Sequence, residues 1–148
     1  MSNAEAATFD LTLHIRDHCL CLHVQRAARA LARRFDEAFR PLGITQGQFS
    51  LLNALNRPEP PTIGSVSALL AMDRTTLTAN LKPLERRGLL KVTIDKEDRR
   101  SRRLILTAAG KALLAKAAPV WRSEHRAVET GLTQAGPGVL RAGLRELS

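Results

Sequence analysis

The chain has 148 residues, 44% of them hydrophobic, with a formal net charge of +9 and a sequence pI near 11.0. A chain of this length forms one domain with an adequate core, and so basic a protein suits a polyanion, either nucleic acid or an anionic membrane surface. No apolar run reaches the roughly 18 residues of a membrane span and no signal-peptide pattern is present, so we expect a cytoplasmic protein with reduced cysteines.

The first expected helix covers residues 17–40. Apolar side chains recur there every three or four positions, which places them on one helical face. This stripe consists of Leu20, Val24, Ala27, Leu31, Phe35 and Phe39. The other face carries four arginines, which we interpret as solvated: Arg26, Arg29, Arg33 and Arg34.

Residues 14–23, HIRDHCLCLH, hold three of the four histidines and both cysteines. On one continuous helix Cys19 and Cys21 point to nearly opposite faces, so no disulfide is expected between them. His14, His18 and Cys21 would share a face and supply half of a metal site. We favour the alternative that the cysteines pack as small hydrophobic residues and that no metal or other cofactor is bound.

Two short helices are expected next, over residues 45–57 and 62–70. Thr45 and Gln48 form a capping-box pattern, and a proline cluster ends the first of these helices. Thr62 is the candidate N-cap of the second. Its expected inward residues are Ile63, Val66, Leu69 and Leu70.

A fourth helix is expected over residues 73–87, with Asp73 as N-cap and Gly88 as the stop. Together with the preceding helix it forms a helix-turn-helix pattern across the short break AMD. Its buried stripe is Leu77, Leu81 and Leu84, and Pro83 is expected to bend it. The opposite face is small, hydroxylated and cationic: Arg74, Thr75, Thr78, Ala79 and Lys82. Such a face can enter a major groove and reach phosphates and base edges.

Two strands, over residues 89–94 and 103–107, are expected to form a hairpin with the charged loop DKEDRRSR. Residues 73–103 hold ten Lys and Arg against five Asp and Glu, so this fifth of the chain supplies +5 of the net charge. Arginines in the loop can enter a minor groove or clamp phosphates. They are Arg99, Arg100 and Arg102. The alternative is a solvated hairpin tip that keeps a sheet edge soluble.

The remaining chain predicts a long helix capped by Thr107 and kinked at Pro119, then a short helix over residues 134–147. The apolar stripe of the long helix is Leu113, Ala117, Val120, Trp121, Val128 and Leu132. We interpret Trp121 as a core residue rather than a ligand-stacking one. The stripes at both ends of the chain are expected to bury against each other or against a partner subunit.

The segments TTLTANLKPLERRGLL and DKEDRRSRRLILTAAG resemble the recognition helix and wing of the MarR family of bacterial winged-helix transcription regulators. The similarity includes LGITQGQFSLLNAL and extends from about Leu20 to the end. It implies a mainly α fold with a small β-wing (α+β) in a single domain. Residues 45–107 would form the winged helix-turn-helix DNA-binding lobe, and residues 11–44 and 108–148 the dimerisation helices.

The resemblance also implies a function: a homodimer that binds double-stranded DNA at a palindromic operator, as a repressor released by a small aromatic or phenolic effector. Arg100 matches the family's minor-groove arginine, which an aspartate often steadies in the family, and either Asp73 or Asp98 is expected to do this here. Some members sense peroxides through a first-helix cysteine, which Cys19 or Cys21 matches. The predicted DNA-contacting residues are thus Ser65, Arg74, Thr75, Thr76, Thr78, Ala79, Lys82, Arg99, Arg100 and Arg102.

Other classes of function fit the sequence less well. There is no glycine-rich phosphate loop, no His-Glu-x-x-His and no Gly-x-Ser-x-Gly, so an enzyme is not expected. A cysteine-based redox- or metal-responsive regulator of the same fold is one alternative. A basic amphipathic module for a membrane surface or a protein partner is the other, but the first helix lacks interfacial tryptophan, so a packed face is favoured.

Overall fold

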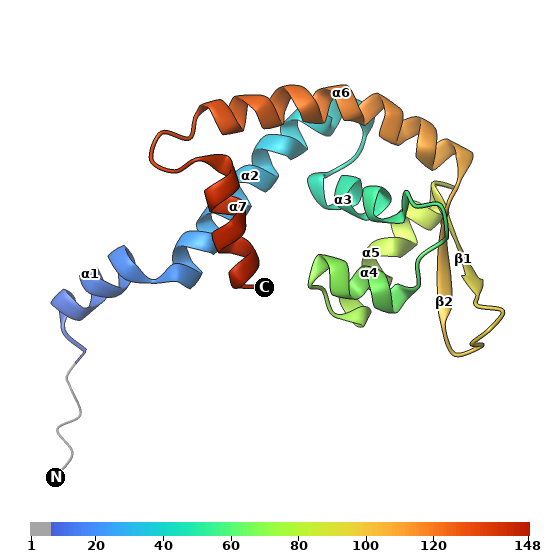
Figure 1. The fold of residues 1–148 in the computed structure, drawn as a ribbon, viewed down its shortest axis with the longest axis horizontal. Helices are drawn as coiled ribbons and strands as arrows, with labels where there is room; N and C mark the ends of the chain where they lie inside the picture. Colours follow the sequence, from blue (N-terminus) through green and yellow to red (C-terminus); the bar gives the residue numbers. More distant parts are fainter. Residues whose placement is uncertain (1–6) are drawn as a thin grey trace, which may run out of the picture.

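The structure is a computed structural model that describes residues 7–148. Its elements in chain order are α1 (Phe9–His18), α2 (Leu20–Phe39), the 3-10 helix η1 (Arg40–Leu42), α3 (Gln46–Leu55), α4 (Ile63–Leu70), α5 (Arg74–Arg86), β1 (Leu90–Ile94), β2 (Arg102–Leu106), α6 (Ala108–Thr130) and α7 (Pro137–Glu146). Figure 1 shows α6 arching over a lobe made of α3, α4, α5 and the hairpin. The predicted mainly helical fold with a small β-wing is confirmed.

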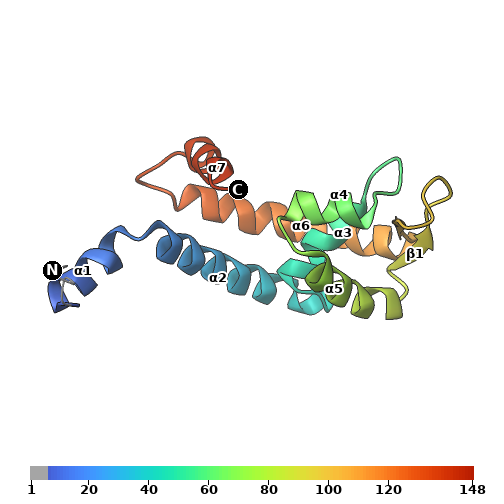
Figure 2. The same cartoon turned by 90° about the horizontal axis from the view of Figure 1, so that it is seen from below.

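Helix α2 and the C-terminal half of α6 form an arm that leads away from the lobe (Figure 2). Near the lobe the two helices share a small core of Phe35, Phe39, Ile44 and Ala117. Farther out, Arg34 Nε lies 2.8 Å from Glu124 Oε2 and ties the helices together. Helix α7 folds back beside α6, where the Arg141 guanidinium lies 2.7 Å from Glu129 Oε1.

The predicted single helix over residues 17–40 is wrong at its start. Helix α1 begins at Phe9, and the backbone is extended at Cys19, with φ −70° and ψ 110°. The Cys19 side chain is the N-cap of α2, because Sγ accepts a hydrogen bond from Leu22 N at 3.5 Å. Apolar residues keep helical spacing on both sides of this break, so periodicity alone did not reveal it.

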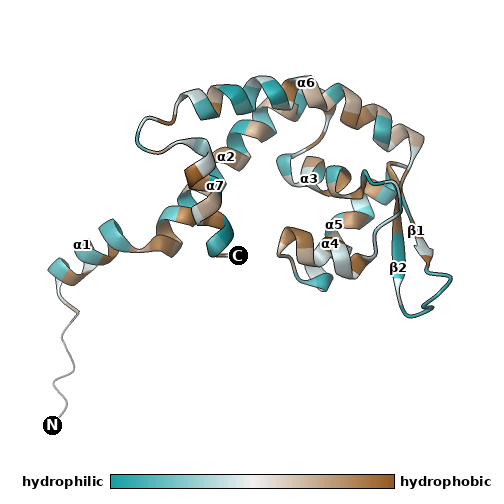
Figure 3. Cartoon of the chain, in the orientation of Figure 1, coloured by the Kyte–Doolittle hydropathy of each residue, from teal (hydrophilic) through white to brown (hydrophobic). Residues whose placement is uncertain are grey.

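Much of the apolar stripe of α2 is exposed in the single chain. Phe35 and Phe39 are buried, but Leu20 is 66% exposed, and Val24 and Leu31 are also exposed. Figure 3 shows further hydrophobic residues along α1 and α7. The exposed set, here called the apolar arm surface, comprises Phe9, Leu11, Ile15, Leu20, Val24, Leu31, Val139, Leu140, Leu144 and Leu147.

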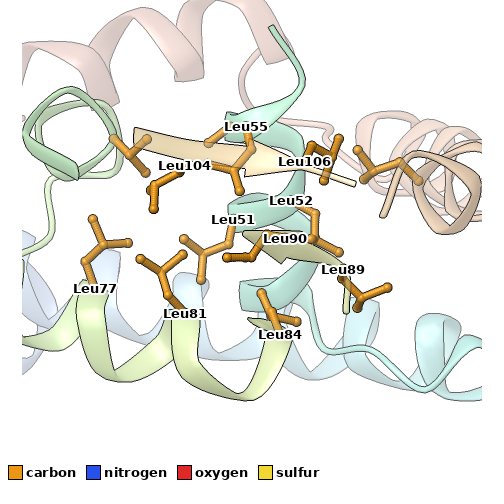
Figure 4. Packing of buried hydrophobic residues seen from close by; sticks show 13 residues of the cluster. Leu51, Leu52, Leu55, Leu77, Leu81, Leu84, Leu89, Leu90, Leu104 and Leu106 are labelled. Carbon is orange, nitrogen blue, oxygen red and sulfur yellow. The ribbon is translucent and has the colours of Figure 1, made fainter. Parts of the chain in front are cut away.

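The helix-turn-helix is built on predicted caps. Thr45 and Gln48 form the complete capping box of α3, Thr62 caps α4 and Asp73 caps α5. Side chains from α3, α5 and the hairpin converge in one leucine-rich core (Figure 4). Its largest members include Leu51, Leu52, Leu55, Leu77, Leu81, Leu84, Leu90, Leu104 and Leu106. The predicted buried stripe of α5 is therefore confirmed.

The prediction that Leu69 of α4 belongs to the core is wrong. Leu69 is 55% exposed, whereas Val66 is buried and Ile63 and Leu70 are partly buried. An eight-residue helix presents only a narrow face to the core, and Val66 occupies its centre. The turn after α4 holds Ala71 at φ 49°, a left-handed conformation that glycine usually supplies.

The hairpin matches the predicted strands to within one residue. Strands β1 and β2 pair in antiparallel register, with Leu90 opposite Leu106 and Ile94 opposite Arg102. A further bridge joins Thr62 to Arg103, so the start of α4 is attached to the edge of β2. This attachment was not predicted, because a single bridge leaves no periodic pattern in the sequence.

The motif Leu-Thr-x-x-Gly joins the hairpin to α6. Thr107 Oγ1 donates to Gly88 O at 2.6 Å and accepts from Gly110 N at 3.1 Å, so this hydroxyl is the predicted N-cap. Gly110 packs its Cα against Leu89, and a Cβ added there would lie 2.2 Å from Leu89 O. The glycine is therefore what lets α6 approach the hairpin.

The C-terminal helices differ from expectation in two respects. Trp121 is 37% exposed and stacks on His125 with ring centroids 4.6 Å apart, so its interpretation as a core residue is wrong for the single chain. Leu132, the last residue of the expected stripe, is also exposed because α6 ends at Thr130. Helix α7 starts at Pro137, three residues later than predicted.

Candidate nucleic-acid interface

Asp73 fixes the first turn of α5. Its carboxylate accepts hydrogen bonds from Thr76 N at 2.8 Å and from Thr76 Oγ1 at 2.7 Å. These bonds favour the ionised form and lower the pKa of Asp73. The hydroxyl of Thr76, a predicted DNA contact, is thus already used within the protein.

This lowered pKa predicts how stability depends on pH. A carboxylate with a lowered pKa stabilises the fold above its ordinary pKa of about 4, and the contribution is lost as pH falls through the lowered value. Asp73→Asn keeps a side chain that can cap the helix but cannot ionise, so its free energy of unfolding should lack this pH-dependent contribution. Urea unfolding from pH 7 to pH 2.5 checks this. If the wild-type and variant curves run parallel, the ionised cap contributes nothing.

All ten predicted DNA-contacting residues have exposed side chains. On α5 they form one face opposite the buried leucines, as the helical period requires. Near this face a hollow of about 360 Å³ is bounded by α4, α5 and the wing loop. Its lining includes Arg74, Thr78, Asp98, Arg100, Ser101 and Arg102. The structure therefore brings four of the ten residues together, while Lys82 lies farther along α5 and Arg99 at the loop tip.

Arg74 lies across the beginning of α4. A Cβ added at Gly64 would come within 3.0 Å of Arg74 Nη2, so the missing side chain leaves room for the guanidinium. Ser65, the predicted contact on α4, is exposed beside it, and its N–H donates to the Thr62 cap at 3.1 Å. The Arg74 guanidinium thus lies where α4 and α5 meet.

Asp98 shapes the tip of the wing through the backbone. Its Oδ1 accepts from Arg100 N at 3.0 Å, and its carbonyl accepts from Ser101 N at 2.9 Å. Within residues 7–148, neither Asp98 nor Asp73 forms an ion pair with the Arg100 guanidinium. Asp98 therefore supports the wing arginine by fixing the backbone turn around it. Asp73 caps α5 instead.

The base of the wing holds a pair that the sequence analysis missed. Asp95 is buried, and its Oδ2 lies 3.2 Å from Arg103 Nη2. Arg103 Nη1 also donates to Pro60 O at 2.8 Å. The available signal was Arg103 near the start of the second strand, together with Asp95 directly after the preceding strand.

The histidine and cysteine cluster does not form the expected shared face. The break at Cys19 separates His14 and His18 on α1 from Cys21 on α2. His14 and His18 stack with ring centroids 4.2 Å apart. Cys21 is exposed and accepts from Gln25 Nε2 at 3.1 Å, so its interpretation as a packed hydrophobic residue is wrong for the single chain. In the part of the chain that the structure describes, no three His, Cys, Asp or Glu side chains converge as metal ligands. The sensor role of Cys19 and Cys21 stays a prediction.

None of the helices between residues 7 and 148 is both long enough and apolar enough to span a membrane.

A family model described as MarR family matches residues 42–101, which run from η1 to the wing tip. The organic hydroperoxide resistance transcriptional regulator of Bacillus subtilis is 31% identical over 101 residues, covering 68% of this chain and 69% of the regulator. The chain belongs to the MarR family. The transcriptional activatory protein BadR of Rhodopseudomonas palustris is 30% identical over 95 residues, and this MarR-family chain spans about half (54%) of its length.

Solved structures of other regulators share the fold of this MarR-family protein. The M. tuberculosis regulator MosR in complex with DNA is 36% identical, with a TM-score of 0.80, and the match covers 88% of this chain and 93% of MosR. Bordetella bronchiseptica BpsR, whose DNA binding is regulated by 6-hydroxynicotinic acid, is 25% identical with a TM-score of 0.77, over 88% of this chain and 93% of BpsR. These relatives are transcription regulators rather than enzymes.

Proposed function

We propose that this MarR-family protein is a transcription regulator that binds double-stranded DNA at a pseudo-palindromic operator. The observation that carries the proposal is the common hollow of α4, α5 and the wing. Among the residues described, Arg74, Arg100 and Arg102 have no carboxylate within ion-pair distance, although all three border this hollow. Cations left without acidic partners suit the phosphates of a nucleic acid. The MosR complex supports the same partner.

The two parts of the surface suit different grooves. The small side chains of Thr75, Thr78 and Ala79 let α5 enter a major groove closely, while Lys82 reaches a phosphate. The wing extends beyond α5 and offers Arg100 to the adjacent minor groove, where the negative potential is concentrated. Both contacts are available to one duplex because the wing and α5 border the same hollow.

The binding species is a homodimer in this proposal. The apolar arm surface is too extensive to stay in water on a chain of this size, and a second copy of the same surface buries it. Residues 11–44 and 108–148 would then be the dimerisation helices, and residues 45–107 the DNA-binding lobe. A two-fold axis would place the two α5 helices on half-sites about 10 base pairs apart. The proposed site of action is the cytoplasm, where a bacterial regulator meets its operator.

A small aromatic or phenolic molecule is the proposed effector. A hollow of about 380 Å³ lies between α2, α3 and α6. Its aromatic lining is Phe35, Phe39, Phe49 and Trp121, and its polar groups are Gln46, Ser50 and His125. The regulation of BpsR by 6-hydroxynicotinic acid supports a ligand of this kind. A ligand that favours another separation of the two α5 helices would release the operator, so the protein would act as a repressor.

Selection from a random duplex library with the purified chain tests the function directly. We expect recovery of an imperfect palindrome, bound by a dimer in sizing experiments. Binding to anionic vesicles without any preference among DNA sequences would instead favour the membrane-surface module and overturn the proposal.

Replacement of Lys82 by alanine should lower the salt dependence of operator binding. Each phosphate contact contributes about 0.9 to the slope of log K against log salt, so the slope should become shallower by about 1. Titrations between 50 and 200 mM salt, roughly the range over which such slopes are resolved, measure it. Lys116→Ala, an exposed lysine on α6, is the control with the same charge change. Equal slopes for the two variants would mean that Lys82 contacts no phosphate.

A further inference from the structure

Asp95 is the one charged residue that is buried among those described, with 8% of its surface exposed. It directly follows β1 and stands where the wing loop leaves the sheet. Its carboxylate accepts from Glu97 N at 3.2 Å, and its own N–H donates to Ser101 O at 3.1 Å. These hydrogen bonds join the two ends of the wing loop and fix the backbone that carries the arginines of the tip.

Arg103 connects the base of the wing loop to the helix-turn-helix. One arm of the guanidinium lies 3.2 Å from Asp95 Oδ2, and the other donates to Pro60 O at 2.8 Å. The backbone of Arg103 forms a bridge with Thr62, whose hydroxyl caps α4. Contacts therefore run without interruption from the base of the wing to the first helix of the motif.

Stability alone is a weak reason for this pair. Burying the Asp95 carboxylate costs free energy, whereas 34% of the Arg103 side chain stays exposed, and well-packed apolar side chains in such places are often as stable or more stable. In addition, a negative charge beneath a DNA-binding surface opposes the approach of a polyanion. The pair differs from an apolar contact in one respect that matters here: it joins the base of the wing to a guanidinium that also donates a directed hydrogen bond to Pro60 O.

We propose that the Asp95–Arg103 pair positions the wing against the helix-turn-helix and thereby sets the preference for operator DNA over other DNA. The inference rests on the proposed function. Asp95 and Arg103 act as positioning residues, because neither borders the hollow that faces DNA. Without them the wing would still carry its positive charge, but Arg100 and α5 would no longer meet one duplex in a single register.

The proposal gives two effects of opposite sign. Removing the negative charge of Asp95 strengthens binding that depends only on charge, so affinity for unrelated DNA should stay equal or rise. Losing the position of the wing weakens contacts that depend on register, so affinity for the operator should fall. The ratio of the two affinities separates a positioning role from a general loss of structure, which would lower both.

The experiment compares two duplexes of equal length and composition: the one recovered from the library by the wild-type chain, and a scrambled version. For Asp95→Asn we expect unchanged or tighter binding of the scrambled duplex and roughly tenfold to 100-fold weaker binding of the selected one, comparable to losing one specific contact. Glu97→Gln is the matched control, since it makes the same charge change at an exposed carboxylate two residues away. It should tighten both complexes alike and keep the ratio.

Two further variants keep the test decisive if Asp95→Asn folds poorly in thermal unfolding. The double variant Asp95→Asn, Arg103→Gln restores the original net charge and leaves no unpaired ion, and it should also lose selectivity. Arg103→Lys keeps the positive charge but not the planar guanidinium that contacts Asp95 and Pro60 O together, and should show an intermediate ratio. A folded variant without the pair that keeps the wild-type ratio would overturn the inference. A wild-type chain with no preference between the duplexes would overturn the proposed function instead.

Discussion

Replacing Gly110 with alanine is expected to lower the free energy of unfolding by about 2–3 kcal/mol, a typical cost of overpacking a well-packed core. A Cβ at this position would lie 2.2 Å from Leu89 O and 2.7 Å from a methyl carbon of Leu106. The first of these neighbours is backbone, and it cannot move without disturbing the Thr107 contacts that join the hairpin to α6. The better helix propensity of alanine offsets only about 1 kcal/mol of the clash.

Gly143→Ala is the matched control for this substitution. Gly143 lies inside α7, and a Cβ added there meets nothing within 4 Å. The control should therefore be neutral or slightly stabilising, because alanine is the better helix former. Urea denaturation followed by circular dichroism measures both variants. Equal stability of Gly110→Ala and the wild type would show that α6 does not depend on this close approach.

Arg100→Ala is expected to weaken operator binding by about 1–3 kcal/mol, or roughly 5-fold to 150-fold in affinity. Three observations support so large an effect for one side chain. Arg100 is exposed at the wing, it borders the hollow shared with α5, and Asp98 fixes its backbone. A backbone fixed in this way reduces the conformational freedom that Arg100 loses when it enters a minor groove.

Arg145→Ala serves as the control, because it removes one exposed arginine from α7, far along the chain from the wing. Mobility-shift titrations of both variants against the selected duplex give the comparison, and sizing shows whether the dimer persists. We expect the control to bind nearly as the wild type does. Undiminished affinity in Arg100→Ala would exclude this arginine from the DNA contact.

The sequence predicted best what neighbouring residues determine. Thr45, Thr62, Asp73 and Thr107 all cap the helices assigned to them, because a cap needs only its own first turn. The leucine stripe of α5 was also predictable, since the core needs an apolar face at helical spacing. These local patterns, with the family resemblance of the wing, were enough to locate the candidate interface.

Contacts between distant parts of the chain were not predictable in the same way. The Asp95–Arg103 pair and the bridge at Thr62 depend on how the hairpin docks on the loop before α4. The break at Cys19 was hidden, because a single extended residue does not disturb the helical spacing around it. Leu69 and Trp121 illustrate a different limit: periodicity shows which residues are apolar but not whether a neighbour covers them.

The close contact at Gly110 gives α6 a mechanical property. The helix is 23 residues long and so spans about 35 Å. One end is fixed to the root of the wing, and the middle borders the aromatic hollow at Trp121 and His125. A rigid rod of this length that tilts by about 5° moves its far end by about 3 Å. In the proposed regulator α6 is therefore a lever that links the hollow to the root of the wing, and Pro119 inside the helix limits how stiffly it transmits a displacement.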